Sequence, residues 1–128
     1  DKSDASYARK IIKEDYLIYF DSDSKYLHNK IRSLTMPGCY CYIGQKRLKL
    51  FDTFYCDKNS YNLDIGNYLY ENESIIIGCK DGVLIVKSMQ FEGKNMISAR
   101  DFNNMNIKNK SFNSIGISSK WKYYLDIF

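Results

Sequence analysis

The stretch IRSLTMPGCYCYIGQKRLKLF, residues 31–51, decides the fold, because it begins with the spacing of a helix and ends with that of a strand. Pro37 and Gly38 stand at the change, and such a pair ends a helix and turns the chain. After them, two runs rich in aromatic and branched residues flank Gly44 and Gln45, which predicts a β-hairpin with strands at 39–43 and 46–56. The stretch therefore predicts a structural corner between a helix and the first hairpin of a sheet.

The predicted helix starts upstream of this stretch. Residues 21–24, DSDS, are of the types that cap helix starts. Leu27, Ile31 and Leu34 then fall at i, i+4 and i+7, the spacing of one apolar stripe. We expect the side chains off this stripe to face solvent: Lys25, His28, Asn29, Lys30 and Arg32.

The second hairpin strand shows the alternation of a half-buried strand. Leu48 and Leu50 alternate with Arg47 and Lys49, so one face can be buried while the other presents two cations. Further along, Asp81-Gly82 between two β-rich runs predicts a second hairpin, with strands at 74–80 and 83–91. Residues 16–20 form a short β-type run, 57–67 a loop, and Ser98 a helix-capping residue before a short helix.

Length and composition favour one small β-rich domain. The chain has 128 residues, 45% of them hydrophobic and 16% aromatic, which suits a single core with more strand than helix. We predict a mainly β fold with one or two short helices, in the form of an OB-like small antiparallel β-barrel. No run of 18 apolar residues or signal peptide is visible, so we expect a cytoplasmic protein without a membrane span.

The positive charge is uneven along the chain. Residues 1–50 hold ten Lys/Arg and six Asp/Glu, whereas residues 51–128 hold nine of each, so the first part carries the whole excess of +4. A concentrated basic excess hints at an anionic partner such as a nucleic acid. An ordinary solvated surface explains the same numbers.

Candidates for catalysis and metal binding are few. His28 is the sole histidine, without an orienting partner in its neighbourhood of sequence, and no phosphate-binding glycine loop is present. Cys39, Cys41, Cys56 and Cys79 lack zinc-ribbon spacing, so we expect buried, reduced thiols. We predict no catalytic residue and no metal site, and a segment that is not catalytic by itself.

Taken in order, several motifs resemble the C-terminal domain of the formyltransferase family, with the methionyl-tRNA formyltransferases as the most similar branch. The resemblance covers residues 6 to about 105. It rests on these positions: Tyr7-Ala8, Lys10-Ile11, Glu14-Asp15, Ile18, Phe20, Ile31-Arg32, Pro37-Gly38, Lys46 to Leu50, Asp81-Gly82, Leu84, Gln90, Gly93-Lys94 and Asp101-Phe102.

The resemblance implies an accessory role beside a catalytic domain. It implies that residues 1–15 link to a missing N-terminal catalytic domain, that 16–105 form the OB-like domain, and that 106–128 are a tail. The parent would use 10-formyltetrahydrofolate, and this segment would bind no cofactor. It would position initiator methionyl-tRNA for N-formylation through phosphate contacts from six cations: Lys10, Lys13, Arg32, Lys46, Arg47 and Lys49.

Two departures from the family pattern favour an alternative. The usual P-W-P-G corner is Thr35 to Gly38 here, without the Trp, and a tail follows Phe102. Relatives that formylate nucleotide-linked sugars carry similar domains. In the alternative, the domain is structural and supports a homodimer through the aromatic segment 115–128.

Overall fold

The computed structural model of this chain describes residues 13–107 and 111–114. A short 3₁₀ helix, η1 (Lys13–Tyr16), comes first and α2 (Ser24–Ser33) follows. The remaining elements are β1 (Tyr40–Ile43), β2 (Lys46–Cys56), β3 (Tyr68–Glu71), β4 (Ser74–Gly78), β5 (Val83–Phe91), β6 (Met96–Ser98), α3 (Ala99–Asn104) and β7 (Phe112–Asn113).

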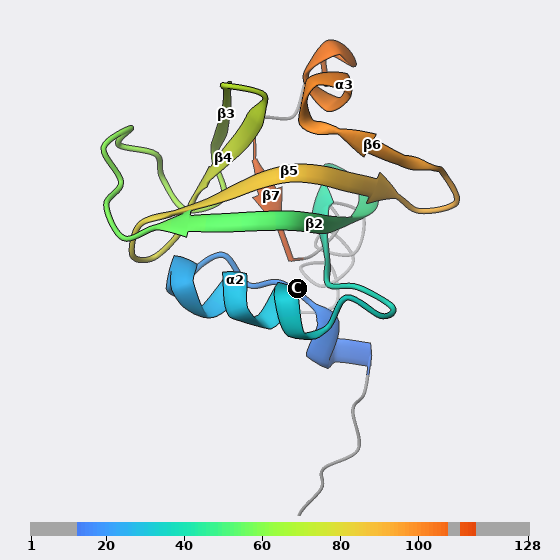
Figure 1. The fold of residues 1–128 in the computed structure, drawn as a ribbon, viewed down its shortest axis with the longest axis horizontal. Helices are drawn as coiled ribbons and strands as arrows, with labels where there is room; N and C mark the ends of the chain where they lie inside the picture. Colours follow the sequence, from blue (N-terminus) through green and yellow to red (C-terminus); the bar gives the residue numbers. More distant parts are fainter. Residues whose placement is uncertain (1–12, 108–110, 115–128) are drawn as a thin grey trace, which may run out of the picture.

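The described strands form one antiparallel sheet in the order β3-β4-β5-β2-β1-β7, and β6 pairs with β5. The sheet curls into a half-barrel, with α2 along β2 and α3 next to β6 (Figure 1). The N–H of Phe112 donates to the carbonyl of Gly66 at 2.7 Å, which ties the start of β7 to the segment before β3. The prediction of a mainly β, barrel-like fold with one or two short helices is confirmed.

β2 and β5 form the centre of the sheet, and the buried positions shift by one residue in both strands, at Asp52 in β2 and at Lys87 and Ser88 opposite it in β5. Before Asp52, Leu50 lies opposite Met89 and both are buried; after it, the buried pair is Thr53 and Val86. Asp52 has φ 51°, in the left-handed region that Asp tolerates better than most residues. The alternation predicted for Arg47 to Leu50 is confirmed, and it does not continue in register beyond Asp52.

Helix α2 closes one side of the half-barrel, as the apolar stripe predicted. Leu27 and Ile31 are buried in the core, and Leu34 packs against it from the C-cap position. Lys30 was expected to face solvent, but its Nζ donates to the carbonyl of Leu17 at 2.7 Å. It therefore fastens the helix to the preceding segment.

The strand predicted at residues 16–20 is reduced to a single bridge. Tyr16 ends η1, Leu17 pairs with Tyr40 in an isolated parallel bridge, and the N–H of Ile18 donates to the Tyr40 carbonyl at 2.9 Å. Ile18 and Phe20 are both buried. The segment therefore fills the core without extending the sheet.

Both predicted hairpins are present. Gly44 and Gln45 join β1 to β2, and Gly78 pairs with Val83 across a four-residue connection that contains Asp81-Gly82. A Cβ on Gly82 would lie 2.0 Å from the carbonyl oxygen of Cys56, so this position requires glycine. The short strands β3, β6 and β7 were not predicted, and the tail expected from residue 106 contributes β7 and the buried Phe112.

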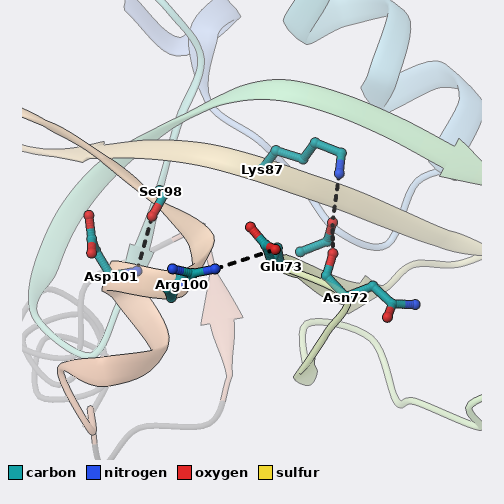
Figure 2. Close-up of polar contacts among 7 residues, drawn as sticks. Asn72, Glu73, Lys87, Ser98, Arg100 and Asp101 are labelled. Carbon is teal, nitrogen blue, oxygen red and sulfur yellow. Dashed lines mark hydrogen bonds and ion pairs between the residues drawn. The ribbon is translucent and has the colours of Figure 1, made fainter.

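Helix α3 begins where the sequence predicted. The Ser98 hydroxyl accepts a hydrogen bond from the N–H of Asp101 at 3.1 Å, an N-cap contact. Arg100 pairs with Glu73 at 3.4 Å, which links the helix to the turn between β3 and β4 (Figure 2). The helix is thus fixed beside the sheet.

The cysteines are free, and three of the four are buried as predicted. The exception is Cys56, which is exposed at the end of β2. Burial raises the pKa of Cys41 well above its usual value and that of Cys79 to about 12, so both thiols are protonated at neutral pH. Within residues 13–107 and 111–114, no group of three or more His, Cys, Asp or Glu side chains could hold a metal, and no helix is long and apolar enough to cross a membrane.

Candidate nucleic-acid interface

Two of the predicted cations meet at the end of the first hairpin. Lys46 and Arg47 directly follow the Gly44-Gln45 turn, and β2–β5 pairing brings the turn after β5 beside them. A hollow opens there, which we call the hairpin-end hollow. It is lined by Gln45, Lys46, Arg47, Phe91, Glu92, Lys94, Asn95, Ile97 and Met105.

Arg47 is the most firmly held cation of this hollow. Its guanidinium carbon lies 4.7 Å from the centre of the Tyr40 ring, and Nη2 lies 3.8 Å from a carboxylate oxygen of Glu92. The Glu92 side chain is 67% exposed, so this ion pair is weak and neutralises Arg47 only in part. The guanidinium group is planar, and stacking on an aromatic ring fixes the direction of its N–H donors, a geometry suited to a phosphate group.

Lys46 and Lys94 add two exposed positive charges to the hairpin-end hollow. Both are exposed, and the Nζ of Lys46 lies 5.8 Å from the centre of the Phe91 ring. The backbone of Lys94 is fixed, because its N–H donates to the Phe91 carbonyl and its own carbonyl accepts from Gln90. Among the described residues that line the hollow, Lys46, Arg47 and Lys94 thus stand against the single acid Glu92.

Lys94 was not among the predicted site residues. It lies outside the basic excess of residues 1–50, although it belongs to the Gly93-Lys94 motif. Only the pairing of β2 with β5 places it beside Lys46.

Lys49 has a structural contact in addition to its predicted role. Its Nζ donates to the carbonyl of Pro37 at 2.7 Å, and its side chain lies against Gly38. Lys49 also lines a shallow hollow beside Arg47. It therefore attaches the turn at Pro37 and Gly38 to β2. It also lies close to Arg47 near the start of the same strand.

The remaining predicted cations do not join this hollow. Arg32 donates to the Asn29 side chain at 3.1 Å and lines a separate hollow between α2 and β2. Lys10 lies outside the described residues, and Lys13 is described only as the start of η1. The proposed dimer segment 115–128 also lies outside the described residues.

His28 is not the exposed helix histidine that the sequence predicted. Its Nδ1 lies 2.9 Å from the Thr53 hydroxyl, and its ring packs against Phe54 and Tyr55. Desolvation lowers the pKa of His28, and the charge of Arg32 lowers it further, so the ring is neutral near pH 7. Its partner is a hydroxyl 25 residues away in the sequence, which could not be found by inspecting its neighbours.

A family model for the C-terminal domain of formyl transferases matches residues 10–106. The chain belongs to this family. It is similar to the methionyl-tRNA formyltransferase of Malacoplasma penetrans, with 35% identity over 121 residues, which cover 94% of this chain and 37% of the relative. It is also similar to that of Kosmotoga olearia, with 37% identity over 101 residues, which cover 77% of this chain and 32% of the relative. That of Ehrlichia chaffeensis is 38% identical over 101 residues, which cover 78% of this chain and 32% of the relative. The formyl transferase domain thus spans about a third of the length of the curated relatives it matches.

Proposed function

We propose that this domain holds methionyl-tRNA for N-formylation, by binding tRNA phosphates at the hairpin-end hollow. The main support is the position of Lys46, Arg47 and Lys94, which line one hollow in which Glu92 is the single acid among the described residues. The names of the similar proteins support tRNA over a nucleotide-linked sugar as the acceptor.

The proposed division of labour leaves the chemistry to another domain of a longer parent enzyme. That domain would take the formyl group from 10-formyltetrahydrofolate and transfer it to the methionyl amino group in the cytoplasm. Residues 1–15 would link the two domains, and 106–128 would extend from residues 16–105. The described residues would position the tRNA and contribute to its binding affinity.

Phosphate binding here would be independent of base sequence. Lysine ammonium groups and a guanidinium attract phosphate oxygens without distinguishing one base from another. Arg47, stacked on Tyr40, would provide a fixed planar contact, while Lys46 and Lys94 would adapt to the local path of the backbone. Four further cations remain proposed phosphate contacts outside the hairpin-end hollow: Lys10, Lys13, Arg32 and Lys49.

The test is a titration of the 128-residue chain with initiator methionyl-tRNA over a series of salt concentrations. The three contacts of Lys46, Arg47 and Lys94 alone should make the binding constant fall roughly fortyfold between 50 and 200 mM salt, because each contact releases condensed counterions, and any further contact should make the fall steeper. Absence of binding at low salt, or binding that does not respond to salt, would contradict the proposal.

A further inference from the structure

A separate hollow lies between α2 and the second half of β2, and Arg32 is the one residue of its described lining that the proposed function already uses. We call it the helix-side hollow. Its lining includes an exposed aromatic side chain, Phe54, two cations, Arg32 and Lys87, and one acid, Asp52. It therefore combines an open ring with a small excess of positive charge.

Phe54 is exposed and yet supported. It keeps 53% of its surface exposed. The His28 ring lies against it with the two ring planes 15° apart and the centroids separated by 6.3 Å. His28 is itself held by the Thr53 hydroxyl at 2.9 Å and by the Tyr55 ring at 5.5 Å. A ring backed in this way loses little freedom when a flat partner stacks on it.

The charges around Phe54 suit an anion beside a flat group. Lys87 donates to the Ser74 hydroxyl at 3.3 Å (Figure 2). This is a long contact, and an ammonium group has three N–H donors, so the same group can also donate to a ligand. Arg32 makes one contact at 3.1 Å, with the Asn29 amide oxygen. Asp52 accepts from Ser88 at 2.8 Å, which occupies one of its carboxylate oxygens. Two cations against one acid leave the hollow with a net positive charge.

We propose that the helix-side hollow binds an unpaired RNA nucleotide, whose base stacks on Phe54 and whose phosphate pairs with Arg32 and Lys87. A nucleotide combines a flat ring with an anion, and proteins bind single strands by placing aromatic side chains beside basic ones. This inference rests on the proposed function, because it assumes that the domain binds RNA. A base within a duplex is already stacked on its neighbours, so only an unpaired base can use this surface.

The experiment compares Phe54→Leu with the wild-type chain, using a six-nucleotide single-stranded RNA and a blunt-ended RNA duplex as probes. The variant should lose about five- to a hundredfold in affinity for the single strand, the range expected for one stacked base, and should bind the duplex as the wild type does. Tyr26→Leu is the matched control, because Tyr26 is an equally exposed aromatic on α2 (58%) that does not line this hollow. It should bind both RNAs normally.

Two further variants test the charges. The double substitution of Arg32 and Lys87 to Gln should weaken single-strand binding and flatten its salt dependence. Asp52→Asn should strengthen it several-fold, since Asn tolerates the left-handed backbone of this position and removes the opposing charge. Thermal unfolding of each variant confirms that the fold is kept.

The outcomes separate this inference from the proposed function. Equal single-strand binding by Phe54→Leu and the wild type overturns the inference, and so does an equal loss on single strand and duplex. If tRNA binding still depends on Lys46, Arg47 and Lys94 in that case, the proposed function stands alone. If the wild-type chain binds no RNA at low salt, both fail.

Discussion

The two halves of β2 present different chemistry to the surface. Before Asp52, the strand carries Lys46 and Arg47 at the hairpin-end hollow; after it, the strand carries Phe54 at the helix-side hollow. The change follows from the exchange of buried and exposed faces at Asp52. A single long strand can therefore offer charge at one end and an aromatic ring at the other.

The largest effect on stability is expected in the core beneath β2, on which both halves of the strand depend. Leu50 is fully buried opposite Met89, two residues before the change of face. Leu50→Ala should lower the free energy of unfolding by about 2–5 kcal/mol, because it removes buried methyl groups and leaves a cavity. Urea denaturation measures this loss. The exposed substitution Phe54→Leu is the control, and an equally small effect of both would show that β2 is not packed as described.

A smaller effect is expected from His28, which packs on the second half of β2 and should make the free energy of unfolding depend on pH. The pKa of His28 is lowered in the folded chain, so folding favours the neutral ring. The corresponding stability is complete above a pH of about 6.5, the unfolded value, and is lost as the pH falls through the lower folded pKa. Urea denaturation between pH 8 and 5 should therefore show a steeper decline for the wild type than for His28→Gln. Parallel curves would contradict the neutral, packed histidine.

The parts of the fold that depend on local spacing could be predicted from the sequence. Each of these patterns joins residues that are only a few positions apart in the sequence. They are the Leu27–Ile31 stripe, the alternation around Leu48 and the Ser98 cap. The change of face at Asp52 could not, because it breaks the alternation on which the prediction relied. The half-buried strand β3, Tyr68–Glu71, has no alternation to detect.

The sites depended on contacts that are distant in the sequence. Lys46 and Arg47 could be predicted because they lie in the Lys46 to Leu50 motif and in the basic part of the chain, whereas Lys94 comes beside them only through strand pairing. His28 and Thr53 are 25 residues apart, so the support of Phe54 was not visible. The charge count along the chain places the basic excess in residues 1–50, but it does not indicate which cations lie together on the folded surface.

The central claim is that the hairpin-end hollow binds tRNA through phosphates. The most direct measurement is the slope of log binding constant against log salt for tRNA, in the wild type and in a variant with Lys46, Arg47 and Lys94 changed to Gln. We expect the slope to become smaller by about 3, or about 1 for each phosphate contact removed.

Two control variants complete this measurement. Lys58→Gln removes an exposed charge from the loop after β2, outside both hollows, and should leave the slope unchanged. Phe54→Leu should weaken tRNA binding without changing the slope, because a stacked ring releases no counterions. A slope in the three-cation variant equal to that of the wild type would contradict the account, as would an equal change per residue in Lys58→Gln.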